Sequence, residues 1–142
     1  MINIFKNKIE DVKSEKNFVL ICALFVHAAK MDENYTDKEK SIILKALSEI
    51  SDKKENELKI ILKKAEKKES QSNQILEFTK EVKNSEKSFR LKILEVLWRI
   101  IYSDGISDMY ESNLMRRLSG LLYVSDKENG DIKKSIINNK TT

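Results

Sequence analysis

The chain has 142 residues, the length of about one domain, with 27 basic and 23 acidic residues and a net charge of +4. It contains no proline and three glycines. Cys22 is its only cysteine, so an intramolecular disulfide and a cysteine-rich metal site are both excluded. No stretch alternates apolar and polar residues in the manner of a strand, so we predict an all-α fold in a single domain, residues 1–142.

The first two predicted helices cover residues 2–12 and 15–31. The N-terminal helix, within residues 1–14, is short and amphipathic and is expected to pack on the core. Ser14 is suited to cap the second helix.

The second helix contains the apolar run FVLICALFVHAA at residues 18–29, in which Cys22 is expected to be a small buried thiol. The run is too short to span a bilayer, and charged sequence precedes it, so it does not read as a signal peptide. We therefore expect a cytoplasmic protein without a transmembrane segment, for which peripheral association with a membrane stays open.

The next two helices are predicted over residues 37–50 and 53–67, and a polar loop at residues 67–73 then forms the clearest internal break. The stretch SDKKENELKIILKKAEKKES pairs lysines with acids at helical spacing, which is typical of a solvated helix face. A nucleic-acid interface would need the positive charge in one stripe with exposed aromatic side chains. Nucleic acid is therefore not the expected partner.

Three further helices and a short last one are predicted over residues 73–83, 86–103 and 109–123 and around Ile132 and Ile136. A turn at residues 124–131, capped by Ser125 or Asp126, precedes the last helix, and the tail 138–142 is expected to fray. The helix at 86–103 is apolar on almost every side, which predicts a place in the centre of the domain.

An offset of 72 residues relates two of the helix pairs. It aligns Asp32 with Asp104, Glu39 with Glu111, and the apolar positions Ile21, Leu24, Phe25, Ala28 and Ile42–Ile43 with Ile93, Val96, Leu97, Ile100 and Leu114–Met115. The matched acids and core positions predict a compact bundle of about seven or eight helices, in which two helix-loop-helix units are related by a pseudo-two-fold axis.

We call the turns inside these units, each taken with the first turn of the helix that follows it, the first corner, residues 30–39 (KMDENYTDKE), and the second corner, residues 102–111 (YSDGISDMYE). Helix capping explains part of both corners. Thr36 and Glu39 have the spacing of a capping box, as have Asp108 and Glu111, and Gly105 is suited to the left-handed residue that ends a helix.

Capping does not explain Asp32 and Asp104, because each ends a helix, where the helix dipole disfavours a negative charge. If the two units pack about a two-fold axis, these residues would meet Glu39 and Glu111 in one cleft. Carboxylates at such a place repel one another unless a cation neutralises them, and hard divalent ions prefer oxygen ligands. Asp32, Glu39, Asp104 and Glu111 are therefore the candidate ligands of a divalent cation, Ca²⁺ or Mn²⁺, although no EF-hand loop is present.

The segments WRIIYSDGISDMYESNLMRRLSGLLYVSD (residues 98–126) and FVHAAKMDENYTDKEKSII (residues 25–43) each join an apolar helix, an acidic turn ending in Glu and a second apolar helix. In this the chain resembles the TerB family over about residues 18–130. The resemblance implies an all-helical fold with acidic clusters proposed to bind metal ions. The family is named for tellurite resistance and is related to a module of the DjlA co-chaperone.

By position, the first Asp of the family motif falls on Asp32 and Asp104, and its terminal Glu falls on Glu39 and Glu111. The chain departs from the motif at Glu33, where the family has glycine, and at Asn34 and Ile106, where it usually has an acid. The loss of two carboxylates predicts weak rather than tight cation binding, because affinity in oxygen sites follows the charge and number of the ligands.

The remaining candidates have simpler structural interpretations. His27, the only histidine, is expected to be a structural residue of an apolar helix, and Trp98 is expected to lie in the core. Arg116 and Arg117 beside Arg99 are placed to form a small basic patch, for which ion pairing with the corner acids is the simpler account. No second histidine, paired cysteine or serine elbow is present to build a nucleophile.

We therefore expect a non-enzymatic TerB-like module that binds a divalent cation or a partner protein through its acidic corners, in metal or envelope stress. The alternative from a different class is a basic helical nucleic-acid-binding protein. A hydrolase that uses the paired acids ranks third, because no pocket-forming set of polar residues accompanies them.

Overall fold

The computed structural model describes residues 15–31, 35–72, 75–80, 82–103 and 109–141, and it describes only the backbone at residues 109–111 and 139–141. Its helices are α2 (Glu15–Ala29), α3 (Asp37–Glu49), α4 (Glu55–Gln71), α5 (Ile75–Thr79), the 3₁₀ helix η1 (Val82–Asn84), α6 (Lys87–Ile101), α7 (Met109–Leu121) and α8 (Asp126–Thr141). No strand occurs in these ranges, and the prediction of an all-α fold is confirmed. The helix predicted at residues 2–12 lies outside them.

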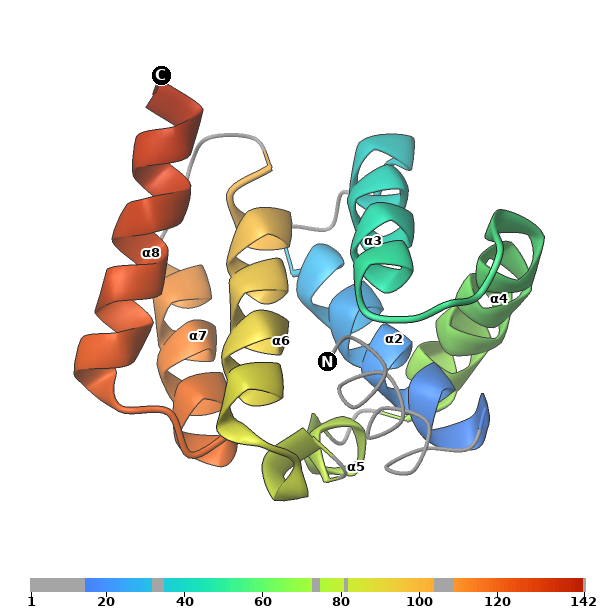
Figure 1. The fold of residues 1–142 in the computed structure, drawn as a ribbon, viewed down its shortest axis with the longest axis horizontal. Coiled ribbons are helices and arrows are strands. Elements are labelled where there is room, and N and C mark those ends of the chain that lie inside the picture. Colours follow the sequence, from blue (N-terminus) through green and yellow to red (C-terminus); the bar gives the residue numbers. More distant parts are fainter. Residues whose placement is uncertain (1–14, 32–34, 73–74, 81, 104–108, 142) are drawn as a thin grey trace.

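Helices α2 and α6 pack against each other in the middle of the molecule (Figure 1). Helix α2 is the more completely buried of the two, with ten buried residues in its fifteen, and it also packs against α3, α4 and α5. Helix α6 buries eight of fifteen residues and packs against α3, α7 and α8. The central position predicted for 86–103 is thus shared with the apolar run of residues 18–29, because both helices are apolar around most of their circumference.

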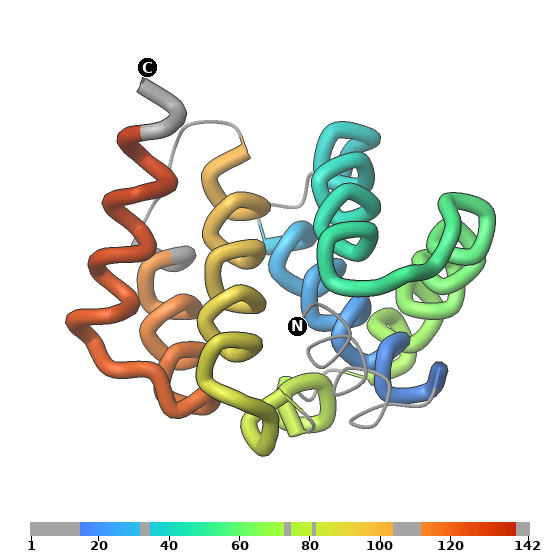
Figure 2. The backbone as a smooth tube through the Cα atoms, viewed as in Figure 1, coloured from blue at the N-terminus to red at the C-terminus, as the bar shows by residue number. Residues whose placement is uncertain are grey.

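The outer helices lie at the two ends of the longest axis, α8 at one end and α4 at the other (Figures 1 and 2). Each has one apolar face toward the core and one charged face toward solvent. The buried residues of α4 are Leu58, Ile61, Leu62 and Ala65, at the spacing of a single helix face. No helix in the described ranges is long and apolar enough to cross a bilayer.

The burial of matched positions follows the offset of 72 residues. Ile21 and Ile93 are both fully buried, and so are the pairs Leu24 and Val96, Phe25 and Leu97, Ile43 and Met115, Ala46 and Leu118. The unit α2–α3 thus repeats the core pattern of α6–α7. The pseudo-two-fold axis that would relate the two units stays a prediction.

The structure differs from the predicted elements at the end of α4. The helix continues to Gln71 through residues that we expected to form a polar loop at 67–73. The physical reason is that its last turns make contacts with distant residues. Glu69 forms an ion pair with Lys30, with 2.8 Å between Oε1 and Nζ, and Lys68 forms one with Glu77, with 2.9 Å between Nζ and Oε1. The helix predicted at 73–83 is also shorter, and is divided between α5 and η1.

A second difference concerns the last helix, which is long rather than short. Helix α8 begins at Asp126, inside the predicted turn 124–131, and continues to Thr141, through most of the tail expected to fray. Ser125 caps it with a reciprocal capping box, since the Glu128 amide donates to Ser125 Oγ at 3.1 Å and the Ser125 amide donates to Glu128 Oε1 at 3.2 Å. Gly130 is accommodated within the helix.

Candidate functional site

Of the four predicted ligands, only Glu39 has a described side chain. Glu39 lies in the first turn of α3 and is buried, with 6% of its surface exposed. Asp32 and Asp104 lie outside the described residues. Glu111 belongs to α7, but its side chain is not among those described.

Glu39 is held at the start of α3 by the residue that caps the helix. Thr36 occupies the N-cap in extended conformation, as predicted, but its side chain makes no hydrogen bond to a backbone amide. Instead the Thr36 hydroxyl donates a hydrogen bond to the Glu39 carboxylate. The expected capping box is therefore replaced by a contact between the two side chains, which fixes one carboxylate of the first corner in a buried position.

The first turn of α3 lies against the end of α6. The ammonium group of Lys38 donates a hydrogen bond to the backbone carbonyl of Ser103, inside the second corner. Ser103 is itself buried, with 7% of its surface exposed. The residue before Glu39 and the residue before Asp104 are thus in direct contact.

A charged network that the sequence analysis missed lies behind the first corner. The Tyr35 hydroxyl donates to Glu66 Oε2 in α4 at 2.5 Å, and Lys40 lies 3.5 Å from the same oxygen. The ammonium groups of Lys30 and Lys40 lie 5.8 Å and 5.1 Å from the centre of the Tyr35 ring. Burial, followed by the hydrogen bond to Glu66, raises the pKa of Tyr35 above its ordinary value. Tyr35 therefore stays a neutral donor that ties the first corner to α4.

The same network includes the only histidine. His27 Nδ1 lies 3.2 Å from Glu69 Oε2, and Lys30 lies 2.8 Å from the other oxygen of that carboxylate. His27 is half-buried, in agreement with the structural role predicted for it. The sequence held one signal for this network: Glu66 and Glu69 are three residues apart in α4 and therefore lie on the same face of that helix.

Cys22 and Trp98 behave as predicted. Cys22 is a free, fully buried cysteine, and burial raises the pKa of its thiol well above the ordinary value, so it is an unreactive core residue. Trp98 is 2% exposed, and its indole Nε1 donates to Asn129 Oδ1 of α8 at 2.8 Å.

Arg99 pairs with acids of α3 and α6 among the described residues. The pairing predicted with the acids of the corners stays a prediction, because Asp32, Asp104 and Glu111 have no described side chain. The Arg99 guanidinium lies 3.3 Å from Glu49 Oε1 and 2.6 Å from Glu95 Oε2. Lys92 lies 3.0 Å from each of the same two oxygens, which completes a four-residue ion cluster between α3 and α6. The pKa of Glu49 is lowered although burial opposes the shift, because Lys92 and Arg99 donate hydrogen bonds to its carboxylate.

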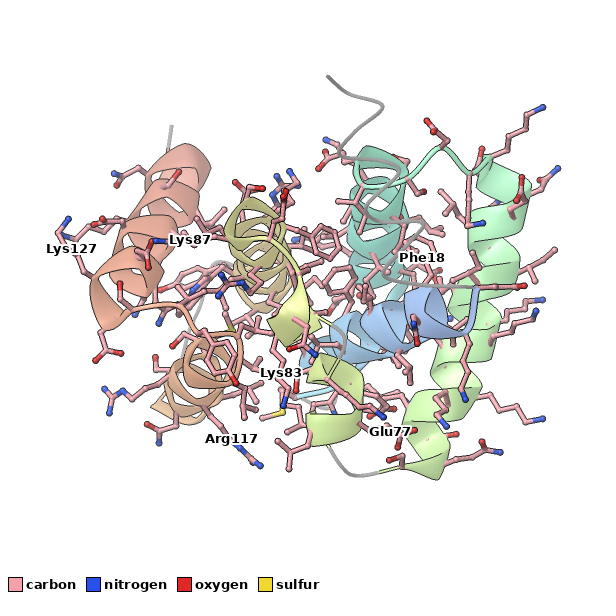
Figure 3. The ribbon with its side chains drawn as sticks, turned by 60° about the horizontal axis from the view of Figure 1, so that its bottom comes forward. Phe18, Glu77, Lys83, Lys87, Arg117 and Lys127 are labelled. Carbon is pink, nitrogen blue, oxygen red and sulfur yellow. The ribbon has the colours of Figure 1, made fainter. Side chains whose placement is uncertain are left out.

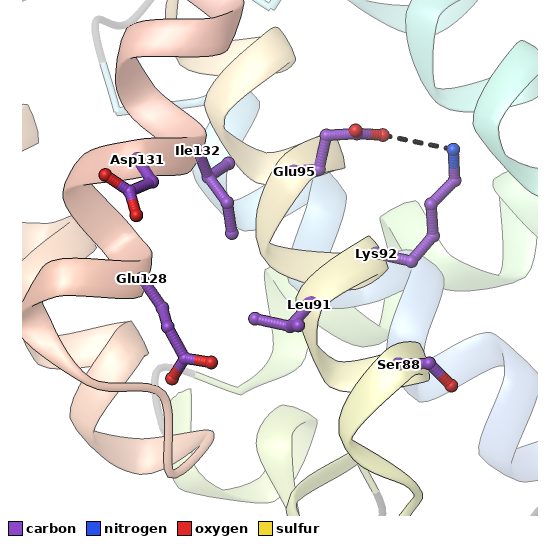
Figure 4. A pocket seen from close by; sticks show the side chains of 7 residues that line it. All are labelled: Ser88, Leu91, Lys92, Glu95, Glu128, Asp131 and Ile132. Atoms are coloured by element: carbon purple, nitrogen blue, oxygen red, sulfur yellow. Dashed lines mark hydrogen bonds and ion pairs between the residues drawn. The ribbon is translucent and has the colours of Figure 1, made fainter.

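A groove of about 420 Å³ separates α6 from α8 (Figure 4). Leu91 of α6 and Ile132 of α8 form its apolar part, with Glu95, Glu128 and Asp131 at its margins. These carboxylates have cationic partners already: Lys92 and Arg99 for Glu95, Lys87 for Glu128, and Lys127 for Asp131. The groove therefore lacks the free charge that a metal site would need.

No group of three or more His, Cys, Asp and Glu side chains among the described residues is arranged to hold a metal ion. Three of the four predicted ligands, Asp32, Asp104 and Glu111, have no described side chain. Glu39 and the contact between Lys38 and Ser103 are the described features of the predicted site.

Comparison with known proteins identifies the family. The sequence model described as "Tellurite resistance protein TerB" matches residues 19–134. No curated protein and no solved structure gives a match. The family match includes both corners, the whole of α3, α4, α6 and α7, and most of α2 and α8. The all-helical fold, the two acidic corners and a family match over most of its length together show that the chain belongs to the TerB family.

Proposed function

We propose that this TerB-family module is non-enzymatic and binds one divalent cation through its two acidic corners. The proposed ligands are Asp32, Glu39, Asp104 and Glu111. The observation that supports the proposal is the hydrogen bond from Lys38 to the Ser103 carbonyl, because it joins the chain next to Glu39 with the chain next to Asp104.

Electrostatics favours a cation at this place. Glu39 is a buried carboxylate whose only described hydrogen-bond donor is the neutral Thr36 hydroxyl. Further carboxylates close to it would repel it, and a hard divalent ion would remove that repulsion.

The proposed affinity is weak, with a dissociation constant on the order of 10⁻³ M, because two acids of the family motif are replaced by Asn34 and Ile106. An incomplete set of protein ligands leaves coordination positions for other oxygens. A partner protein that supplies a carboxylate would complete the coordination, and this is how we propose that cation binding and partner binding are connected. Metal or envelope stress is the proposed setting.

Thermal melting tests the proposal. A ligand that binds only the folded chain stabilises it by mass action, by roughly 1.4 kcal/mol at ten times the dissociation constant. For a chain of this length we expect Mn²⁺ or Ca²⁺ to raise the Tm by roughly 3–5 °C over the value in chelator. Asp104→Asn should abolish the rise without lowering the Tm of the cation-free protein, since it removes charge repulsion and an unfavourable contact with the helix dipole.

Asp108→Ala is the matched control within the same corner. It removes the predicted cap of α7, so it should lower stability by roughly 1 kcal/mol and leave the cation-induced rise intact. An equal rise in wild type and Asp104→Asn, or no rise in wild type, would leave helix capping as the sufficient role of these acids.

A further inference from the structure

Helix α4 has one face in the core and one face that no other described element covers. Its inner residues pack against α2 and α3, and the helix forms one edge of the molecule (Figures 1 and 3). The outer face is built from the exposed side chains Asn56, Glu57, Lys59, Ile60, Lys63, Lys64 and Lys67. We call this set the α4 outer face.

The α4 outer face is positively charged. Lys59 lies 3.4 Å from Glu55 and Lys64 lies 2.8 Å from Glu15, and all four of these side chains are more than half exposed. Lys63 and Lys67 form no ion pair with any acid of the described chain. Four lysines against three acids, Glu15, Glu55 and Glu57, leave a net positive charge on a surface about 12 Å long, since Lys59, Lys63 and Lys67 follow one another at intervals of four residues.

An apolar side chain lies within this charge. Ile60 is 55% exposed and is next to Lys59 in sequence, with Lys63 and Lys64 one turn further along the same helix. It is one of only three large apolar side chains of the described chain that are so exposed. Lysines around an exposed aliphatic residue form an amphipathic surface, because their methylene stems lie against apolar material while the ammonium groups reach a polar layer.

A basic groove continues this surface toward α2. It has a volume of about 320 Å³ and an apolar floor of Val19 and Leu20. Lys16, Lys64 and Lys68 stand around that floor together with Glu15. The surface that combines apolar and cationic side chains thus continues from α4 onto α2.

We propose that the α4 outer face docks on the surface of a bilayer that contains anionic phospholipids. The ammonium groups would lie at the level of the lipid phosphates, and Ile60 would enter the boundary between headgroups and acyl chains. Duplex or single-stranded nucleic acid fits the face less well. Residues 53–71 include neither an arginine nor an aromatic side chain, so bidentate contacts and base stacking are both missing.

Sedimentation with lipid vesicles tests the proposal on the full chain. Vesicles of pure phosphatidylcholine and vesicles with 30% phosphatidylglycerol are compared at low and at high salt. We expect binding to the anionic vesicles only, and weaker binding at high salt because the attraction is screened. The double variant Lys63→Ala with Lys67→Ala should bind about 25-fold more weakly, at roughly fivefold for each lysine.

The matched control removes two positive charges from the other end of the molecule. Arg117→Ala with Lys134→Ala replaces exposed residues of α7 and α8, where Arg117 extends away from the core (Figure 3). This variant should bind like wild type. Ile60→Asn keeps every charge and should still weaken binding. Ile60→Trp should give a blue-shifted fluorescence on anionic vesicles, whereas wild type, whose single tryptophan Trp98 is buried, should give no such shift.

Four results would overturn the proposal. They are no binding to anionic vesicles, equal binding to both kinds of vesicle, an equal loss in the control variant, and retained binding in the lysine double variant. Binding of duplex DNA or RNA that requires Lys63 and Lys67, without vesicle binding, would assign the face to nucleic acid instead. Asp104→Asn should not change vesicle binding, so this test is independent of the proposed cation site.

Discussion

Lys38 and Ser103 belong to different helix pairs and are in direct contact, since the Lys38 ammonium donates a hydrogen bond to the Ser103 carbonyl. Ser103 follows the end of α6, where backbone carbonyls lack partners within the helix. A cation is the favoured donor at such a place, because the carbonyl end of a helix is the negative end of its dipole. The contact therefore joins α3 to α6 where the first corner ends and the second corner begins.

The first prediction concerns this contact. Lys38→Met keeps most of the side chain and removes the donor, so it should lower the free energy of unfolding by roughly 1 kcal/mol. Urea denaturation measures the change. Lys45→Met is the control, because Lys45 is also an exposed lysine of α3. Equal stability of the two variants would mean that the contact with Ser103 contributes nothing.

The second prediction concerns the attachment of α8 to the core. Asn129→Leu leaves the buried Trp98 indole without its acceptor, so it should lower the free energy of unfolding by roughly 1–3 kcal/mol. Asn129→Asp keeps an acceptor oxygen at the same place and should lose less. Urea denaturation of both variants is the measurement, and a larger loss in Asn129→Asp would show that the indole hydrogen bond is not the important feature.

The helices whose buried residues follow the 3.6-residue period could be predicted closely from the sequence. Helices α2, α3 and α6 begin and end within two residues of the expected places. The last turn of α4 could not be predicted, because KKESQ is locally polar and its helix is stabilised by Glu69 and Lys68 reaching His27, Lys30 and Glu77. Residues distant in sequence decide its length.

The start of α8 was predicted only in part: Ser125 was named as a capping residue, as the structure has it, but residues 124–131 were assigned to a turn. VSDKENGD has the composition of a turn, and Gly130 lowers helix propensity. The capping box of Ser125 and Glu128 outweighs that preference, and its spacing was visible in the sequence. In the candidate site, the spacing placed Glu39 in the first turn of its helix but predicted neither its side-chain contact with Thr36 nor the contact between Lys38 and Ser103. Those depend on how α3 packs against α6.

The third prediction concerns backbone strain after α7. Tyr123 has a φ of 56°, in the left-handed region, and its side chain is 64% exposed. The Val124 amide donates to the Ser119 carbonyl at 2.8 Å, so Tyr123 holds the place where a helix end usually has glycine. Tyr123→Gly should therefore raise the free energy of unfolding by about 1 kcal/mol. Thermal and urea denaturation should agree, and Tyr123→Ala, which keeps a Cβ atom, should give no such gain.

The fourth prediction concerns acid stability. Hydrogen bonds from Lys87 first, and from Ser125 second, lower the pKa of Glu128 from its ordinary 4.5 to about 2. A folded-state pKa below the unfolded value means that the stabilisation is present above pH 4.5 and is lost as the pH falls toward 2. Carboxyl chemical shifts should follow this titration, and Lys87→Met should move the pKa upward. A slope of stability between these pH values that is the same in wild type and Glu128→Gln would contradict the assignment.

The central proposal is that the two corners form a single cation site rather than two separate ones. Titration of Mn²⁺ into the chain, followed by electron paramagnetic resonance, counts the bound ions and measures their affinity. We predict one weakly bound ion per chain in wild type, and loss of that ion in Asp32→Asn and equally in Asp104→Asn, because each corner supplies part of one coordination sphere. Two bound ions of which each variant loses one, or an affinity that neither substitution changes, would contradict the account.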